Sequence, residues 1–521
     1  MATTITGVRV FDGERLTEHT AVRLEGGLID AVGGDELLRP GDQHVAGRGT
    51  LLPGLIDAHV HLLPGASRQA LTFGVTTLLD MFSKPETVRE AEAEGGADVR
   101  SSSIGATAPG GHPSMMYAPF PYVTGPADAE AFVADRVAEG ARHLKVLYDD
   151  GGPLRVPSLD VPTVAALVSA AHGAGLLAVA HVTTAAAAVD LLPTGVDVLA
   201  HVPFDPLTAT QVAAIGEAGV AVIATLSIAD GFPGDVLLEA PELAGRLGPA
   251  WSDVLRRQAH RWLPPELPDF AAAARNVGLL YEAGVTVLAG TDAPNPGIVH
   301  GASVHRELQR LVAAGLTPVE ALAAATARTA EVFGLADRGR VLPGLRADLL
   351  LVDGSPDVDV AETQRIAAVW KDGVRADVDG YVGSAAERAG LEALRAQTEK
   401  VIAAVREMLP VTVRRDEDGE VLGHLRREGT GWQPVTVFGG VLAGPSSREE
   451  AEEVLRRDGL ASLGEVWWVH SGAEFREARI QEARPDRIRI RWADPLVEQS
   501  PQGEWIDPRV VRIQRQRPEA E

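Results

Sequence analysis

Two histidines lie two residues apart in an otherwise apolar stretch, GLIDAHVHL, which runs from Gly54 to Leu62. An apolar run of this length predicts a buried strand, and side chains two positions apart in a strand point to the same side. His59 and His61 are therefore expected to bring two imidazole rings to one place. Imidazole nitrogen is a common metal ligand, so the pair suggests a metal site, although a single pair of this kind also occurs by chance.

Four more side chains that suit a metal site follow at the ends of later apolar stretches. They are Lys145 in RHLKVLY, His181 in LLAVAHV, His201 in VDVLAHV and Asp292 in VTVLAGTD. Each has a simpler structural explanation, such as a lysine that reaches the rim, a hydrogen-bonded core histidine or an aspartate that caps a turn. Six such residues at successive strand ends are hard to attribute to chance. We therefore predict that they form one cluster.

Lys145 and Asp292 have specific chemistry within this cluster. Lys145 is one of only four lysines and lies in an apolar strand, where burying an ammonium group is costly. A desolvated lysine has a lowered pKa, acts as a nucleophile and with CO2 can form a carbamate whose two oxygens bridge two cations. A carboxylate beside metal ions, here Asp292, is the natural proton acceptor for bound water.

The elements that position these residues alternate along the chain. From about residue 52 to 335, short apolar strands alternate with Ala-rich stretches that can be helical, which is typical of a parallel sheet. Eight such units predict an α/β fold, a (β/α)8 TIM-like barrel at 53–337, with the catalytic groups at the C-terminal ends of the strands. The segment at about 226–268 is longer than an ordinary connection, so we predict a helical lid insertion there.

The segments outside the barrel have different patterns. Residues 1–52 and 338–382 alternate apolar and polar positions between turns, which predicts that they form one small β-sandwich. A charged helical linker is expected at 383–409. Residues 410–521 hold five of the eight tryptophans and no cluster of catalytic side chains, so we predict a separate accessory domain of unknown role.

Composition limits the partners and the kind of metal site. The chain has 521 residues with 45% hydrophobic content and a formal net charge of -24, which argues against nucleic acid and anionic membrane partners. We expect a small-molecule substrate, and a homo-oligomer is left open. Because there are no cysteines, any metal must bind nitrogen and oxygen. The chain starts without a basic and apolar leader, and no apolar run is long enough to span a bilayer, so a cytoplasmic location is expected.

The chain resembles the amidohydrolase superfamily, in the branch with a lysine on the fourth strand and two divalent metals. The resemblance covers roughly Thr3 to Val382, and its motifs occur in the family's order: LPGLIDAHVHL, HLKV, AHV, AHVPF, GTDAP, HRELQRLVAAGLTPVEALAAAT and GRVLPGLRADLLLVDGSP.

The resemblance implies a ligand set and a reaction. His59 and His61 would bind the more buried metal with Asp292, His181 and His201 would bind the second, and a carboxylated Lys145 would bridge both. Zinc is the favoured metal, with manganese, cobalt or iron as alternatives. A hydroxide between the two cations would attack an amide carbonyl, with Asp292 as general base.

The substrate and its contacts are less constrained by the sequence. His112 and Tyr148, in loops that follow the third and fourth strands, are predicted to touch substrate, ahead of Tyr117 and Tyr122. Family members with this layout hydrolyse dipeptides ending in proline, N-acyl amino acids and other amides. Imidazolone-opening relatives and deaminases fit less well, because they generally lack the bridging lysine. A non-catalytic binding protein on a barrel scaffold is the alternative of another class.

Overall fold

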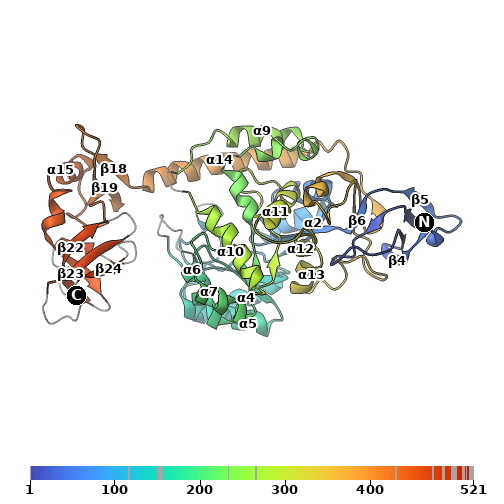
Figure 1. Cartoon of the computed structure of the whole chain (residues 1–521), viewed down its shortest axis with the longest axis horizontal. Coiled ribbons are helices and arrows are strands. Elements are labelled where there is room, and N and C mark those ends of the chain that lie inside the picture. Colours follow the sequence, from blue (N-terminus) through green and yellow to red (C-terminus); the bar gives the residue numbers. More distant parts are fainter. Residues whose placement is uncertain are drawn as a thin grey trace. The chain divides into compact units, whose positions relative to one another are not determined.

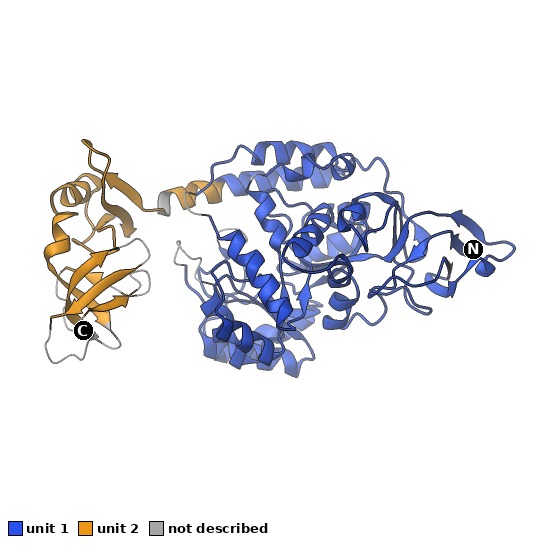
Figure 2. Cartoon of the chain, in the orientation of Figure 1, with its two compact units in different colours: residues 1–399 blue, residues 400–521 orange. Residues whose placement is uncertain are grey.

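The structure is a computed structural model, and it divides into two compact units. Unit 1 is 1–399 and unit 2 is 400–521, with the boundary inside helix α14 (Ala385–Met408) (Figure 2). The described residues are 2–114, 118–149, 156–232, 234–264, 267–428, 431–471, 474–483, 487–493, 502–506, 511 and 513–515. Tyr117 and three residues of the predicted 226–268 insertion lie outside the described residues.

Eight strands of unit 1 form the parallel region, and each overlaps an apolar stretch predicted to be a strand, although the third shares only two residues with the predicted RSSSIGAT. They are β7 (Leu55–Val60), β8 (Val75–Asp80), β9 (Asp98–Ser101), β10 (His143–Leu147), β11 (Leu177–His181), β12 (Val198–Ala200), β13 (Ala221–Ile223) and β14 (Val287–Leu288). Every pairing between neighbouring strands of this set is parallel. Because parallel strands require a crossover connection, helices must alternate with them.

These strands belong to two sheets, one of order β7-β8-β9 and one of order β10-β11-β12-β13-β14. Isolated parallel bridges join the sheets at both edges, at Ala106 with Val146 and at Val60 with Ala293. At the first of these edges the Ala106 N–H donates to the carbonyl of Lys145 at 2.8 Å. The mixed α/β fold is confirmed, while the strands pair continuously only within each sheet.

Helices follow the strands and cover them, as the green and yellow parts of Figure 1 show. They are α1 (Ala66–Thr72), α2 (Pro85–Ala93), α4 (Ala129–Ala138), α5 (Val161–Gly173), α6 (Ala185–Leu191), α7 (Ala209–Ala218), α10 (Phe270–Glu282), α11 (Ala302–Ala313), α12 (Pro318–Ala324) and α13 (Ala327–Val332). Five begin at an oxygen-bearing side chain that accepts a backbone N–H of the first turn, the usual helix start: Asp160, Thr184, Thr208, Asp269 and Thr317.

Apolar side chains fill the space between the parallel strands. Six strands contribute to one buried cluster through Ile56, Leu79, Val179, Val198, Ile223 and Leu288. Residues at the strand ends are thereby held on a packed support, which is what a precise site requires. Among the described residues, no helix combines the length and apolar character needed to cross a membrane.

Two further sheets come from the segments that flank the parallel strands. One has the order β4-β3-β1-β5 and the other the order β17-β16-β15-β6-β2. The strands are β1 (Thr3–Thr6), β2 (Arg9–Val10), β3 (Ala21–Glu25), β4 (Leu28–Gly33), β5 (Gln43–Ala46), β6 (Thr50–Pro53), β15 (Leu349–Val352), β16 (Ile366–Lys371) and β17 (Val374–Arg375). Both sheets supply the same buried cluster, which includes Ile5, Leu24, Leu51, Leu349 and Trp370.

The long segment after β13 is helical along much of its described length. It contains the 3-10 helices η5 (Leu226–Gly231) and η6 (Val236–Leu238), then α8 (Pro241–Ala244) and α9 (Pro249–Gln258). At its end, the Gln258 side chain accepts a hydrogen bond of 2.7 Å from the Gly297 N–H, in the loop that follows Asp292. The segment therefore contacts a loop that leads from the candidate site, and its role as a lid stays a prediction.

Two buried carboxylates attach the start of this segment to α11. The Glu307 carboxyl is fully buried and accepts hydrogen bonds from the backbone N–H groups of residues 226–227, at 3.0 and 2.6 Å. Asp230 accepts from Arg306 and from Arg310, each at 2.9 Å from Nε. The first turn of the insertion is thus fixed, because its free N–H groups are satisfied by α11.

Replacing Glu307 with glutamine should change how stability depends on pH. Burial raises the pKa of Glu307 from 4.5 to about 8, so the folded chain holds this proton more tightly than the unfolded chain. This stabilisation is present below the ordinary value and is lost as the pH rises towards about 8. Between about pH 5 and pH 8, urea denaturation should show the wild type losing about 1 kcal/mol or more relative to Glu307→Gln.

Glu90→Gln, at an exposed position of α2, is the matched control and should follow the wild type at every pH. If the wild type instead gains stability over Glu307→Gln as the pH rises, the carboxyl is ionised in the folded protein and the assignment is wrong.

Unit 2 contains two sheets and a helix. It has a three-stranded sheet, β18-β19-β20, and a five-stranded sheet, β24-β23-β22-β21-β25. Its elements are β18 (Val411–Arg414), β19 (Val421–Glu428), β20 (Gly431–Val435), α15 (Arg448–Asp458), β21 (Val466–Ser471), β22 (Glu474–Ala483), β23 (Ile488–Trp492), β24 (Glu504–Ile506) and β25 (Ile513–Gln514). Trp467 is fully buried, contacts Phe438 edge-on at 5.1 Å and donates its indole N–H to the Ser462 carbonyl. Trp467 is therefore a core residue.

Candidate metal centre

Three side chains from the two ends of the parallel region meet at one point. His59 is the fifth residue of β7, His61 directly follows that strand, and Asp292 follows β14. Asp292 Oδ1 lies 3.4 Å from His59 Nε2 and 3.1 Å from His61 Nε2. One possible ligand atom from each residue lies within 4.8 Å of the other two, a spacing that suits a shared cation. The three side chains, which the sequence pattern placed at the ends of strands, thus lie close together in the structure.

His201 and His181 extend this group on the side of β11 and β12. His201 Nε2 lies 3.9 Å from Asp292 Oδ2, and the rings of His201 and His59 have centroids 4.7 Å apart. The ring of His181 is 4.6 Å from that of His201. Burial strongly lowers the pKa of His59 and His201, which keeps both imidazoles neutral, the form that binds a metal.

Lys145 lies in the middle of β10 with its ammonium group enclosed. The residue is 1% exposed, and its Nζ has no hydrogen-bond partner among the described residues. Burial lowers the pKa of Lys145 to about 7, against the opposing charges of Asp292 and Asp80. A substantial fraction of this amine is therefore neutral and nucleophilic near neutral pH.

Several buried polar atoms of the group lack the partners that a folded protein normally supplies. Besides Lys145 Nζ, they include His59 Nδ1, His181 Nε2 and Asp292 Oδ1, when partners are sought among the described residues. Most buried polar atoms are hydrogen-bonded, so a cluster of exceptions calls for an explanation. Nitrogen and oxygen atoms oriented towards one region match the donor set of a divalent metal site, so the residues fit such a group.

Hydrogen bonds to a neighbouring carboxyl group position His59 and the loop that carries Asp292. The fully buried Asp57 carboxylate accepts hydrogen bonds from Thr291 Oγ1 at 2.6 Å, from the Thr291 N–H at 2.9 Å and from the His59 N–H at 3.2 Å. It therefore ties β7 to the loop that carries Asp292. Burial raises the pKa of Asp57 to about 7. Sequence reasoning missed this residue, although Asp57 continues the two-residue spacing of His59 and His61.

Strained backbone accompanies these contacts. His201 and Asp292 have φ angles of 73° and 59°, in the left-handed region that non-glycine residues rarely adopt. Thr225, whose Oγ1 lies 2.7 Å from His201 Nδ1, has a φ of 48°, and Ser103 has a φ of 57°. All four lie just beyond strand ends. Such conformations cost of order 1 to 3 kcal/mol each and concentrate at functional sites.

Comparison with known proteins identifies the family. The amidohydrolase family model matches residues 50–378, which is more than half of the chain and includes every residue of the cluster. The chain belongs to the amidohydrolase family. The resemblance drawn from the motifs is thereby confirmed.

The individual relatives match this amidohydrolase either at low sequence identity or over a short stretch. It is 27% identical over 381 residues to an imidazolonepropionase of Cereibacter sphaeroides, covering 65% of this chain and 90% of that protein. A shorter match, 42% identical over 100 residues, covers 18% of this chain and only 25% of an imidazolonepropionase of Deinococcus deserti. In fold it is similar to a solved Xaa-Pro dipeptidase, with a TM-score of 0.58, 22% identity and coverage of 72% of this chain and 100% of that one.

The residues predicted to touch substrate in this amidohydrolase lie at different distances from the cluster. His112 stacks on His181 with ring centroids 5.1 Å apart, and burial lowers the pKa of His112 to about 4. The Tyr148 hydroxyl donates a hydrogen bond of 3.3 Å to Asp190, which lies on α6. Tyr122 packs with Phe120 in a separate apolar group. His112 is thus the one of these that reaches the cluster.

Asp149 is a further neighbour that the sequence reasoning missed. Its Oδ2 lies 3.5 Å from His181 Nε2, and its Oδ1 accepts a hydrogen bond from Thr183 at 2.9 Å. Asp149 lies two residues past β10, the strand that carries Lys145. This position just beyond a strand is the signal that could have identified it.

Proposed function

We propose that this amidohydrolase is a binuclear metal-dependent hydrolase that cleaves a carbon–nitrogen amide bond of a small molecule. The observation that carries the proposal is the buried group of unsatisfied nitrogen and oxygen atoms around Asp292, beyond the end of β14, and Lys145, in the middle of β10. Membership of the family supports a hydrolase acting on carbon–nitrogen bonds. We also propose that the two parallel sheets, bridged at both edges, act as one closed barrel.

The residues that would hold the metals follow from their grouping. His59, His61 and Asp292 would bind one divalent cation, and His181 with His201 would bind the other. The neutral Lys145 amine would add to CO2 and release one proton, and the carbamate so formed would bridge both sites. Zinc suits this set of nitrogen and oxygen donors. When bound, two such cations lower the pKa of water and polarise a carbonyl.

The chain itself would manage the proton and the geometry. Asp292 would accept a proton through a carboxylate oxygen and return it to the leaving nitrogen. Although burial disfavours its charge, the side-chain contact with His61 lowers the pKa of Asp292 to about 2, so the carboxylate is ionised. Asp57 and Thr291 would hold Asp292 in position. His112, stacked beside His181, would contact the substrate.

Two substrate classes fit this proposal. Dipeptides of the Xaa-Pro type are favoured by the buried lysine together with the structural likeness to an Xaa-Pro dipeptidase. N-acyl amino acids offer the same amide bond to the same groups. The sequence relatives are imidazolonepropionases, so an imidazolone ring belongs in the same screen. Turnover of any of these by metal-loaded protein would reject a non-catalytic binding protein.

Purified protein should contain close to two divalent metal ions per chain. Five nitrogen or oxygen ligands and a carbamate exceed what one four-coordinate ion needs. Elemental analysis of protein grown with excess zinc measures the ratio. His470→Ala, in unit 2, is the control and should leave it unchanged, whereas His201→Ala should lower it towards one. A reproducible content of one ion or none in the wild type would reject the binuclear site.

A further inference from the structure

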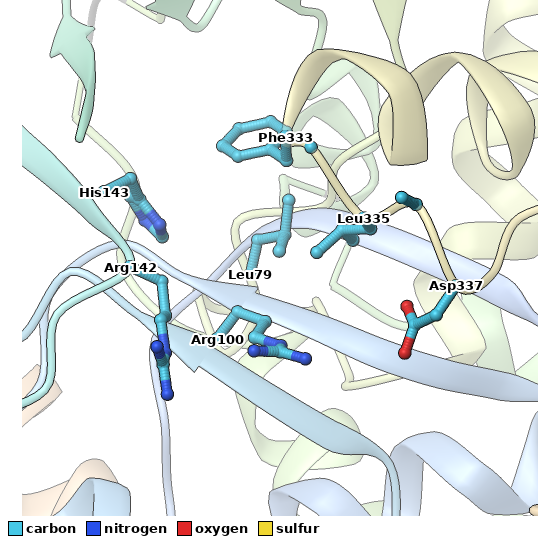
Figure 3. Close-up of a pocket in the computed structure, with 9 residues that line it drawn as sticks. Leu79, Arg100, Arg142, His143, Phe333, Leu335 and Asp337 are labelled. Atoms are coloured by element: carbon cyan, nitrogen blue, oxygen red, sulfur yellow. The ribbon is translucent and has the colours of Figure 1, made fainter. Parts of the chain in front are cut away.

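A cavity lies near the beginning of β10, lined by residues that do not belong to the histidine cluster. Its volume is about 380 Å³, within the range of small-molecule sites. Figure 3 shows Arg100 and Arg142 on the side of this cavity opposite Phe333, with Leu79 and Leu335 between them. The cavity thus has a basic side and an apolar side.

The position of the cavity separates it from the candidate metal centre. Arg142 directly precedes β10, and His143 is the first residue of that strand, two residues before Lys145. Side chains two apart point to the same side of a strand, so His143 lies about 7 Å below Lys145 along β10. At β10 the cavity therefore lies at the N-terminal end of the strand, whereas folds of this kind carry their chemistry at the C-terminal strand ends.

The two arginines of the cavity lack the partners that other arginines of this region have. Arg338 contacts Asp98 at 2.6 Å and Asp337 at 2.8 Å. By contrast, within the described ranges no carboxylate lies within 4.0 Å of Arg100 or Arg142, and neither side chain has a hydrogen-bond partner there. Arg100 is partly exposed and Arg142 is exposed, so both guanidinium groups are open to a bound anion.

The acidic residue of the cavity does not neutralise this pair. Asp337 is occupied by Arg338, and its other oxygen lies 3.8 Å from Arg346. Burial, followed by the charges of Arg338 and Arg142, lowers the pKa of Arg100, and the charges of Asp98 and Asp337 oppose this only in part. An anion in the cavity would relieve this repulsion, because a guanidinium binds oxyanions through paired N–H donors.

The apolar side of the cavity favours organic anions over inorganic ones. Phe333 lies edge-on to His143 with centroids 5.6 Å apart, and Leu79 and Leu335 continue this surface. An inorganic anion would leave it unused. An organic anion with a short apolar body would cover it and gain the free energy of apolar burial.

We propose that this cavity binds a small organic oxyanion, with its carboxylate or phosphate group at Arg100 and Arg142 and its apolar body against Phe333 and Leu335. The site is separate from the proposed catalytic function and does not depend on it.

Calorimetric titration of the metal-loaded 521-residue protein at constant ionic strength tests the proposal. The probes are hexanoate, phenyl phosphate, inorganic phosphate and the neutral hexanol. We expect saturable binding of hexanoate or phenyl phosphate, with at least about tenfold weaker binding of inorganic phosphate and of hexanol. Arg100→Gln and Arg142→Gln should each weaken binding by about tenfold or more, the usual effect of losing a charge-assisted hydrogen bond.

Arg89→Gln, at an exposed position of α2, is the matched control and should bind as the wild type does. Ala336→Phe, at an exposed position that lines the cavity, should also weaken binding without removing either arginine. It keeps the test decisive if an arginine variant fails to fold. The proposal is overturned if no organic anion binds, if inorganic phosphate binds equally well, or if binding survives in both arginine variants and in Ala336→Phe.

Discussion

Asp292→Asn should retain much of its metal and yet lose on the order of 10² to 10⁴ in kcat, the usual effect of removing a positioned acid–base group. The asparagine oxygen can still lie near His59 and His61, whose Nε2 atoms are 3.4 and 3.1 Å from Asp292 Oδ1 in the wild type. The asparagine amide of the variant, however, cannot accept a proton. Elemental analysis and a pH–rate profile on the same preparation separate the two roles, because an acid-side limb in the wild type should vanish from the residual activity.

Asp190→Asn is the control for this substitution. Asp190 accepts a hydrogen bond from Tyr148 and is not part of the cluster, so the same chemical change there should leave kcat within about twofold of the wild type. Near-normal turnover by metal-loaded Asp292→Asn would show that another group moves the proton, with His112 as the first candidate from its stacking on His181.

Lys145→Ala should lose one of two metal ions and most of the activity, on the order of 10² or more in kcat. The physical reason is that its buried Nζ, which has no hydrogen-bond partner in the described structure, is the only lysine nitrogen at the cluster that could carry a bridging carbamate. Added acetate or propionate should restore part of both, because a free carboxylate can occupy the place of the carbamate.

Lys145→Met distinguishes this role from a structural one. Methionine fills similar space without a buried charge, so Lys145→Met should be at least as stable to heat as the wild type while remaining inactive. Lys400→Ala, at an exposed position of α14, should change neither metal content nor activity. A fully active Lys145→Ala enzyme would remove the carbamate from the mechanism.

The order of the parallel strands along the chain and the site residues at their ends were predictable, because each rests on a local rule. Alternation of short apolar runs with Ala-rich stretches located seven of the eight strands closely and β9 with an overlap of two residues, and parallel strands bring their C-terminal ends together. That geometry joins His59 to Asp292 across more than two hundred residues of sequence. The end of a strand is thus a strong positional signal.

The remaining features depend on contacts that no local rule contains. Thr225 supports His201 only because β13 lies beside β12, and its hydroxyl resembles many others in the sequence. Tyr148 has the expected loop position, but Asp190 on α6 determines its direction. The unpaired state of Arg100 and Arg142 is a property of what surrounds them, and a sequence does not state which carboxylates will be too far away.

The left-handed backbone at His201 and Asp292 bears on how this chain can change over time. Glycine would remove the strain at either position, so each is a place where a simple substitution would gain stability at the expense of the side chain. The replacement that relaxes the backbone is thus the same one that removes the imidazole or the carboxylate. Any attempt to make this chain more heat-stable must therefore leave these two positions alone and look for its gains elsewhere.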